Sequence, residues 1–235
     1  MKFFVTGVAG QLGHDVMNEL HKRGYEGVGS DLAPSYNGIQ DGTAVTAMPY
    51  VSVDITDAEA VEKAITKFGV DGVIHCAAWT AVDAAEDEDK QETVRKVNVL
   101  GTENIAKVCQ KLNIKMMYLS TDYVFDGQGT TPWEPDCKDY KPLNVYGQTK
   151  LDGELAVFDN VDKYFIIRIA WVFGKNGKNF IKTMLNVGKT HDTLKVVNDQ
   201  IGTPTYTYDL ARLMIDMILT DKYGYYHATN EGGYI

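Results

Sequence analysis

A chain of 235 residues, 44% of them hydrophobic, can bury a substantial core as one large domain or as one domain plus a small lobe. Its formal net charge of −9 and sequence pI near 5.0 argue against a nucleic-acid surface, which would need clustered Lys and Arg. No apolar run reaches the roughly 20 residues of a membrane span, and the three cysteines lack metal-ligand spacing, which predicts a cytosolic protein without a zinc site.

The N-terminus predicts a strand, a glycine turn and a helix in immediate succession. Residues 2–6 have the apolar character of a short buried strand, Gly7, Gly10 and Gly13 follow at once, and an apolar-periodic segment continues to about Lys22. Such glycines let the backbone approach a pyrophosphate, at which the helix N-terminus directs its N–H groups. Because the Gly-x-x-Gly-x-x-Gly spacing departs from the commoner Gly-x-Gly-x-x-Gly, a plain tight turn is the alternative.

The second and third predicted strands both lead to an acidic residue. Residues 26–30 lead to Asp31, 18 positions past Gly13 and near the spacing of roughly 20 expected for a ribose-binding acid. The alternative is a loop aspartate that caps a turn. After an aperiodic loop over residues 32–49, a strand over residues 50–53 leads to Asp54 and Ile55, which are placed to flank an adenine. A capping box at residues 56–59 then predicts a helix to residue 68.

The fourth strand, residues 72–76, is followed by small residues at the edge where open parallel sheets bind ligands. Ala77 and Ala78 would let a cofactor lie close to the backbone. His75 lies inside the apolar strand and is interpreted as a packed core residue. The acidic run over residues 86–89 raises a metal site as one alternative, but adjacent carboxylates at a helix start are more often a solvated face, and we assign no metal.

The middle of the chain completes a repeating pattern of strands and helices. A long helix carrying Asn98 is predicted to reach about residue 113, and a fifth strand covers residues 115–120. Strand and helix have then alternated five times, which predicts an α/β fold with a doubly wound parallel (Rossmann) sheet. Thr121 would emerge at the ligand-binding edge. Residues 124–143, rich in Gly, Pro and Asp, are either a lid over a pocket or a long surface loop.

The stretch Asn144-Val-Tyr-Gly-Gln-Thr-Lys150 opens a predicted helix on which Tyr146 and Lys150 share one face. An unperturbed tyrosine titrates near ~10, and a neighbouring ammonium favours the phenolate. Tyr146 is therefore a candidate general acid. Taken alone, the same spacing also fits a packed tyrosine beside a solvated lysine.

The last third of the chain predicts a sixth strand and a second, smaller region. Arg168 lies within the strand over residues 164–170, so we expect it to have a buried carboxylate or carbonyl partner. The segments 179–187, 193–198, 207–219 and 224–228 then predict helix, strand, helix and strand. We expect residues 1–171 to form an NAD(P)-binding domain and residues 172–235 to form part of a substrate-binding lobe.

Together these features resemble the extended short-chain dehydrogenase/reductases, and within them the dTDP-4-dehydrorhamnose reductase branch. The resemblance covers residues 6–13, 77–83, 119–127, 144–154, 168–174 and 198–205, which span most of the chain. The pair of motifs Ser-Thr-Asp-Tyr-Val-Phe at residues 120–125 and Asn-Val-Tyr-Gly-x-Thr-Lys at residues 144–150 is specific to this branch. The glycine turn is shared by the whole superfamily.

The resemblance implies hydride transfer from NADH or NADPH to the C4 ketone of dTDP-4-dehydro-β-L-rhamnose, giving dTDP-L-rhamnose. Tyr146 would donate the proton, Thr121 would give a second hydrogen bond, and Lys150 would lower the tyrosine pKa and hold the nicotinamide ribose. Asn98 would assist a proton relay. The implied sugar-binding residues are Thr80, Val82, Asp122, Tyr123 and Trp171. The cofactor-binding residues are Gly7, Gly10, Gln11, Leu12, Gly13, Asp31, Asp54, Ile55, Ala77, Ala78, Tyr146 and Lys150.

Two other functions would share this fold. A non-catalytic relative would bind the dinucleotide and regulate a partner enzyme, but intact Thr121, Tyr146 and Lys150 weigh against it. A sugar-nucleotide epimerase or dehydratase is the nearer rival; dehydratases carry acidic residues after the strand-end Thr, whereas here Asp122 is followed by Tyr123. The expected partner is a nucleotide sugar, with no nucleic acid and no membrane, and a homodimer is an alternative to a monomer.

Two further expectations concern the coenzyme and the end of the chain. Because Asp31 would face the ribose and residues 32–49 contain no Arg or Lys, we expect NADH to bind at least as well as NADPH. Members of the resembled family usually continue well past the stretch at residues 226–232 into helices of the sugar-binding lobe. We therefore expect a truncated lobe, and a longer form that gains activity and melting temperature together.

Overall fold

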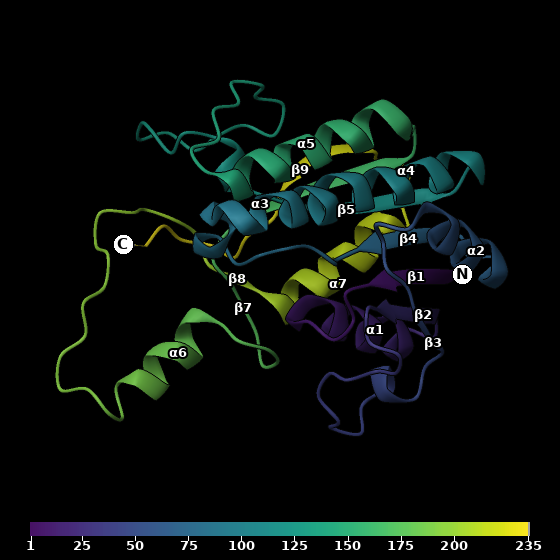
Figure 1. The fold of residues 1–235 in the computed structure, drawn as a ribbon, viewed down its shortest axis with the longest axis horizontal. Coiled ribbons are helices and arrows are strands. Elements are labelled where there is room, and N and C mark those ends of the chain that lie inside the picture. The colour runs from purple at the N-terminus through teal and green to yellow at the C-terminus, as the bar shows by residue number, and fades with distance from the viewer. Residues whose placement is uncertain (235) are drawn as a thin grey trace.

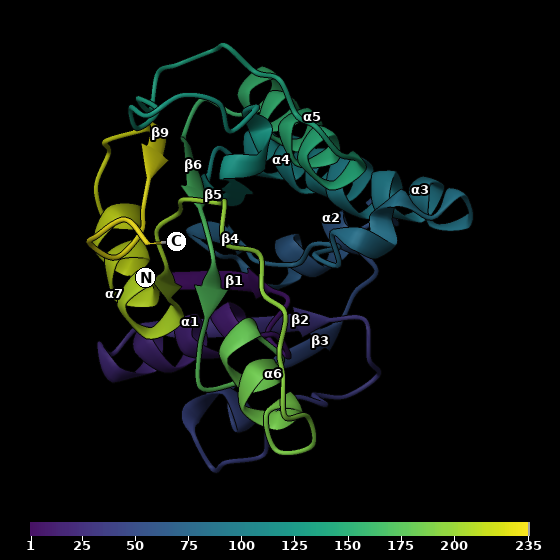
Figure 2. The ribbon, with the colours of Figure 1, turned by 90° about the vertical axis from the view of Figure 1, so that its left-hand side faces the viewer.

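A seven-stranded parallel sheet forms the centre of the computed structural model, which describes residues 1–234 (Figures 1 and 2). The strand order is β3-β2-β1-β4-β5-β6-β9, and every neighbouring pair is parallel. The strands are β1 (Lys2–Thr6), β2 (Glu26–Asp31), β3 (Tyr50–Ser52), β4 (Gly72–His75), β5 (Lys115–Thr121), β6 (Tyr164–Ile169) and β9 (Gly224–His227). The order reverses between β1 and β4, which is where open parallel sheets bind ligands, and the predicted doubly wound fold is confirmed.

Helices cover both faces of this sheet (Figure 2). Helices α1 (Gln11–Lys22) and α7 (Thr207–Ile218) share one hydrophobic core, and α2 (Ala58–Phe68), α4 (Gly101–Lys111) and α5 (Val145–Asn160) share the other. Because side chains alternate along a strand, Phe3 and Val5 pack with α1 and α7 while Phe4 packs in the second core. Within residues 1–234, no helix combines the length and apolarity that a membrane crossing requires.

The predicted boundaries differ from the structure at a few places, each with a local cause. The N-cap of α2 is Asp57, whose carboxylate accepts from the N–H groups of Glu59 and Ala60, whereas Thr56 donates its hydroxyl to Asp54. The N-cap therefore lies one residue later than predicted, and the predicted capping box is wrong, because Ala60 at the N3 position has no carboxylate to return the bond. A short 3-10 helix, Ala44–Thr46, interrupts the predicted loop over residues 32–49.

The strand predicted over residues 193–198 is wrong. Leu194, Val196 and Val197 are exposed, and no strand ladder includes them. Their apolar side chains resemble a strand in sequence, but no sheet edge lies beside them. Instead, the two-residue strands β7 (Val172–Phe173) and β8 (Thr205–Tyr206) pair with each other, and strands this short carry no readable period.

The predicted long helix before β5 is interrupted by a π-helical turn. Helix α3 (Glu88–Arg95) continues through the π turn Lys96–Leu100 directly into α4. The extra residue of a π turn changes which side chains share a face, and such turns are frequent at functional sites. Here the turn carries Asn98, which is buried.

Two elements beyond the expected domain boundary at residue 171 complete the sheet and its covering. Strand β9 extends the sheet beside β6, and α7 packs directly against α1. Thr207 at the start of α7 donates a hydrogen bond to Asp15 of α1 over 2.5 Å. Helix α6 (Phe180–Val187) instead projects away from the sheet (Figure 1).

Candidate active site

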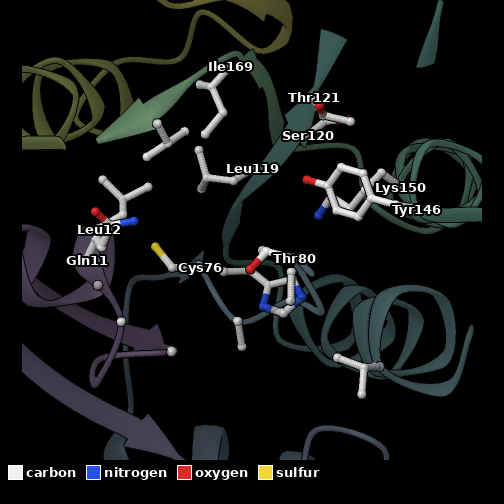
Figure 3. A pocket seen from close by; sticks show the side chains of 18 of the residues that line it. Gln11, Leu12, Cys76, Thr80, Leu119, Ser120, Thr121, Tyr146, Lys150 and Ile169 are labelled. Carbon is white, nitrogen blue, oxygen red and sulfur yellow. The ribbon is translucent and has the colours of Figure 1, made fainter. Parts of the chain in front are cut away.

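A cavity of about 620 Å³ lies at the carboxyl ends of the central strands. Apart from Asn98, it is lined by every residue to which the sequence analysis assigned catalysis, cofactor binding or sugar binding, although these residues come from segments spread over residues 7–171. Figure 3 shows Gln11 and Leu12 on one side of this cavity and Thr121, Tyr146 and Lys150 on the other. The structure thus brings the predicted residues together, while their individual roles stay predictions.

The glycine turn is packed so tightly that side chains would not fit. Gly7 has φ +70°, a left-handed conformation, and a Cβ atom there would lie 2.7 Å from the backbone N of Ala77. A Cβ on Gly13 would clash with the carbonyl oxygen of Gly7. The N-cap of α1 is Gly10, and its first turn contains no acidic residue, so this helix end is suited to an anionic ligand.

Asp31 both lines the cavity and braces the glycine turn. Its carboxylate accepts hydrogen bonds from the backbone N–H groups of Ala9 and Leu32 over 3.1 and 2.9 Å. The two readings of this residue, ribose acid and turn cap, are therefore compatible, because each carboxylate oxygen has a second lone pair to offer.

A buried hydrogen-bonded chain fixes the edge of β4 below the cavity. Thr6 Oγ1 lies 2.8 Å from His75 Nδ1 and accepts from the N–H of Ala77 over 3.1 Å. His75 Nε2 lies 3.1 Å from Thr102 Oγ1. Burial, with a smaller contribution from the charge of Lys150, lowers the pKa of His75 to about 3. His75 is thus a neutral core residue, as expected, and it positions Ala77 at the cavity wall.

Two side chains fix the start of helix α5. The side chain of Asn144, the N-cap, accepts from the N–H of Gly147 over 2.7 Å. Glu86 accepts from the N–H of Val145 over 2.7 Å, so this member of the acidic run caps the same helix. Both contacts flank Tyr146, whose ring also meets Tyr123 edge-on at 6.0 Å. The helix predicted from the sequence therefore presents Tyr146 in a fixed orientation.

The electrostatics of Tyr146 and Lys150 differ from the sequence expectation. Burial raises the pKa of Tyr146 well above its usual value, while the side chain of Thr121 acts in the opposite direction. Burial lowers the pKa of Lys150 to about 7, against the charges of Glu154 and Cys76. The causes of the Tyr146 pKa shift do not include the charge of Lys150, so the lowering of the tyrosine pKa by Lys150 stays a prediction.

Lys150 is held by an aromatic ring that the sequence analysis did not identify. Its ammonium nitrogen lies 4.2 Å from the ring centroid of buried Tyr118, a cation–π contact. The Tyr118 hydroxyl donates to the carbonyl oxygen of Lys150 over 3.2 Å. Contacts with Tyr118 therefore fix Lys150 at both its backbone carbonyl and its side-chain nitrogen.

Thr121 and Asp122 form a short polar pair at the end of β5. Thr121 Oγ1 donates to Asp122 over 3.0 Å and accepts from the N–H of Tyr123 over 3.2 Å. Burial raises the pKa of Asp122, opposed by the hydrogen bond from Thr121. The Thr121 hydroxyl is therefore oriented by its neighbours on the cavity wall.

Asn98 has a structural role that the sequence analysis did not predict. Its side chain accepts from the N–H of Trp79 over 2.8 Å and donates to the Trp79 carbonyl and to Thr149 Oγ1 over 3.2 and 3.1 Å. Thr149 in turn donates to the carbonyl oxygen of Tyr146 over 2.9 Å. Because both amide hydrogens are used, Asn98 connects the loop after β4 to helix α5, and its part in a proton relay stays a prediction.

Trp171 lines the cavity from a strained backbone. Its φ of +45° is unusual for a residue with a bulky side chain. Thr205 holds the segment, since its hydroxyl donates to the carbonyl of Ala170 and its N–H to the carbonyl of Trp171. Gly202 packs against the indole, with no room for a Cβ atom.

Several lining residues were missed by the sequence analysis. Most of them lie at strand ends, where the rule that parallel sheets bind ligands at their carboxyl edge could have found them. They are Ser30, Leu32, Val53, His75, Cys76, Val97, Leu119, Ser120, Ile169, Ala170, Val172 and Lys178. Within the described residues, the hydroxyls of Ser30 and Ser120 are buried without a hydrogen-bond partner, and no cluster of three or more His, Cys, Asp or Glu could hold a metal.

Comparison with known proteins gives consistent matches over the whole chain. The family described as RmlD substrate binding domain matches residues 1–234. A dTDP-4-dehydrorhamnose reductase from Streptomyces griseus is 38% identical over 238 aligned residues, covering 99% of this chain and 71% of the relative. The crystal structure of a dTDP-4-dehydrorhamnose reductase from Clostridium acetobutylicum is 39% identical with a TM-score of 0.85, covering 100% of this chain and 76% of that one. One from Bacillus anthracis, in complex with NADP, is 35% identical with a TM-score of 0.86, covering 99% and 76%.

Proposed function

The chain belongs to the family described as the RmlD substrate-binding domain, and on that premise we propose that it reduces the C4 ketone of dTDP-4-dehydro-β-L-rhamnose to give dTDP-L-rhamnose. It is an NAD(P)H-dependent oxidoreductase of nucleotide-sugar biosynthesis. One observation carries the proposal beyond family membership. A single cavity joins the glycine turn at β1 to Thr121, Tyr146 and Lys150, which are the groups that carbonyl reduction requires.

The residues present fit a nicotinamide dinucleotide. The tightly packed glycine turn leaves a cradle that a side chain would fill, and α1 begins there without an acidic residue. The unpartnered hydroxyls of Ser30 and Ser120 are buried at the cavity, where a polar ligand would satisfy them. We assign the pyrophosphate to the residues of this turn, the adenosine ribose to Asp31, the adenine to Asp54 and Ile55, and the nicotinamide ribose to Tyr146 and Lys150.

In this proposal the protein contributes a proton and an environment for developing charge. When bound, the nicotinamide supplies the hydride. As the ketone becomes an alkoxide, Tyr146 donates its phenolic proton to the oxygen. Because burial raises the pKa of Tyr146, its phenol stays protonated at neutral pH, which is the form a proton donor needs. Thr121, released from Asp122, offers the same oxygen a second hydrogen bond.

The experiment that tests the function is a reduction assay. The purified protein is mixed with NADH and the 4-keto sugar nucleotide, and the loss of reduced nicotinamide is followed by absorbance. We expect one nicotinamide oxidised for each sugar reduced at C4. A sugar-nucleotide epimerase or dehydratase would convert the sugar without net consumption of NADH, and a regulatory subunit would convert none, so either outcome would contradict the proposal.

Coenzyme choice is expected to depend on Asp31. We propose that NADH binds at least as well as NADPH, because the carboxylate lies at the end of β2 and residues 32–49 contain no Arg or Lys to pair with a 2′-phosphate. Asp31→Ala should weaken NADH by about tenfold and NADPH by less, which binding titrations of both coenzymes measure. If the variant acted only by losing the contact with Ala9 and loosening the turn, NADH and NADPH would be weakened equally. The ratio of the two dissociation constants is therefore an internal control. A parent protein that strongly prefers NADPH would contradict this placement.

A further inference from the structure

A lysine from a distant part of the chain lines the cavity without an assigned role. Lys178 belongs to residues 174–179, which follow β7 and which we call the strap. This inference rests on the proposed function, because the dinucleotide cofactor carries a negatively charged pyrophosphate that a lysine could bind. Because the chain has a net charge of −9, it repels an anionic ligand unless cations near the binding site offset that repulsion.

The strap lies against the first residue of helix α1, where the proposed pyrophosphate site begins. Asn179 donates a side-chain hydrogen bond to Gln11 Oε1 over 3.0 Å. Gly177, with φ +66°, packs so closely that a Cβ there would lie 2.7 Å from Gln11 Cγ and 3.7 Å from the Gln11 backbone N. Lys178 lies between these two contacts and is an exposed residue that lines the cavity, which places it at the end of the cavity formed by the glycine turn and Gln11.

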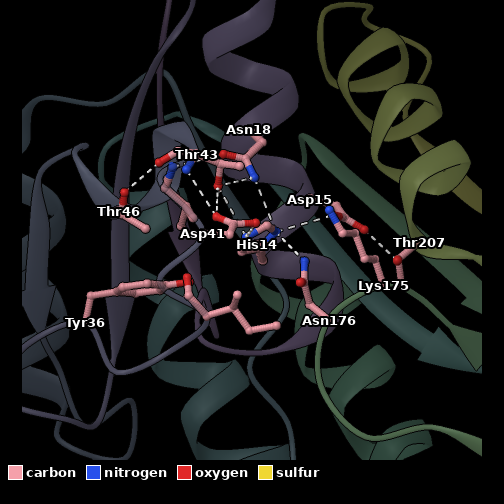
Figure 4. Close-up of polar contacts among 12 residues, drawn as sticks. His14, Asp15, Asn18, Tyr36, Asp41, Thr43, Thr46, Lys175, Asn176 and Thr207 are labelled. Atoms are coloured by element: carbon pink, nitrogen blue, oxygen red, sulfur yellow. Dashed lines mark hydrogen bonds and ion pairs between the residues drawn. The ribbon is translucent and has the colours of Figure 1, made fainter. Parts of the chain in front are cut away.

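The strap is held in shape from both sides. Asn176 is only 3% exposed, and its amide nitrogen lies 2.6 Å from His14 Nδ1 (Figure 4). Because an amide nitrogen only donates, His14 is the acceptor. Lys182 of α6 donates to the carbonyl oxygens of Lys175 and Gly177, and Asn179 donates to the carbonyl of Gly174 over 2.9 Å. These contacts engage the side chains of Asn176 and Asn179, whereas within residues 1–234 the Lys178 ammonium forms no hydrogen bond or ion pair, so it is available to a ligand.

His14 connects the strap to the rest of the cofactor side of the molecule. It lies on α1 one residue after the glycine turn, and Asn18 of the same helix contributes a second amide to its Nδ1 over 3.2 Å. Its Nε2 lies 3.5 Å from Asp41 Oδ2 and 3.4 Å from Thr43 Oγ1, in the loop after Asp31 (Figure 4). The strap, helix α1 and this loop therefore form one connected polar unit.

The distribution of charge in the cavity leaves Lys178 to compensate the pyrophosphate. Three carboxylates line the cavity, those of Asp31, Asp54 and Asp122. Within the described residues, two lysines line it, and Lys150 lies beside Tyr146 on α5, away from the glycine turn (Figure 3). An ammonium is a point charge well suited to phosphate oxygens. We propose that Lys178 binds the pyrophosphate of the dinucleotide, held over the glycine turn by the strap.

The test compares ligands with and without phosphate. NADH, ADP, adenosine and dTDP are titrated into the parent, Lys178→Ala, Lys178→Arg and Lys175→Ala by calorimetry, and each variant's melting temperature is measured. Lys178→Ala should bind NADH and ADP about tenfold more weakly, with adenosine unchanged, because one charge-assisted contact is lost. Lys178→Arg should recover most of the affinity. Lys175→Ala is the matched control, since it removes the same charge from the same strap at a position that does not line the cavity.

Several outcomes would overturn the inference. Parent-like binding of NADH by Lys178→Ala would do so, and so would an equal loss in Lys175→Ala, which would indicate a general effect of charge. Equal losses for adenosine and ADP would indicate a displaced strap instead of a phosphate contact. Weaker binding of dTDP with unchanged NADH would assign the lysine to the sugar nucleotide. A parent that reduces the ketone while Lys178→Ala binds NADH normally would leave the proposed function standing, whereas a parent that does not bind NADH would remove both.

Discussion

Replacing Tyr146 by phenylalanine is expected to lower the turnover number by about 10²-fold or more, the usual scale for a lost general acid. The variant keeps the partly buried ring and its edge contact with Tyr123, so dinucleotide binding should change little. Only the proton donor is removed from the cavity wall. The turnover number is measured from NADH consumption with the 4-keto sugar nucleotide, and the dissociation constant of NADH is measured separately.

The matched control for this variant is Tyr50→Phe. The Tyr50 hydroxyl donates to the carbonyl of Ala33 and does not line the cavity, so its removal makes the same chemical change outside the site. We expect near-normal turnover from it. Normal turnover from Tyr146→Phe itself would show that another group supplies the proton and that the assignment is wrong.

The largest expected loss of stability comes from the buried ion pair between Glu154 and Arg168. The two side chains are 0% and 1% exposed, and the guanidinium donates to both carboxylate oxygens over 2.9 and 2.8 Å. Glu154→Gln leaves a buried charge without its partner, which should cost about 3–5 kcal/mol of unfolding free energy. Urea unfolding with an unchanged m-value measures this.

Two further variants are controls for the effect of burial and for the effect of leaving one charge unpaired. Glu62→Gln removes one partner of an exposed pair with Lys111 and should cost no more than about 1 kcal/mol, because solvent screens it. The double variant Glu154→Leu, Arg168→Met replaces both charges with apolar groups and should recover much of the loss. If Glu154→Gln unfolds at the same urea concentration as Glu62→Gln, the buried pair does not stabilise the fold as argued.

Local pattern was sufficient for the sheet because most of its strands are short apolar runs that end at a turn signal, and β1, β3, β4 and β5 are each followed by a helical period before the next strand. It failed where the chain has no such period. Residues 193–198 have the β-branched and apolar composition of a strand, yet a strand forms only beside a free sheet edge, which is a tertiary property. The π turn at Lys96–Leu100 was likewise not predicted, and it carries Asn98, whose contact with Trp79 joins residues 19 positions apart.

The candidate site could be assembled from the sequence because parallel strands deliver their carboxyl ends to one edge. Thr121, Tyr146 and the glycine turn follow from that rule with the motif spacing. Lys178 does not, since nothing near it in sequence indicates that its segment returns to Gln11. The burial that lowers the pKa of Lys150 to about 7 could not be predicted from the sequence either. The helical spacing of Tyr146 and Lys150 carries no information about what surrounds the side chain.

The packing of α7 on α1 also sets the order in which this protein can fold while it is being made. Helix α1 buries Val16, Met17 and Leu20 in a core that α7 completes, and the hydrogen bond from Thr207 to Asp15 joins residues 192 positions apart. A ribosome adding about 5–20 residues per second needs about 10 to 40 s to make that length of chain. Until α7 has emerged, the part of the α1 apolar face that α7 covers has no partner, so we expect the cofactor cradle to reach its full stability only then.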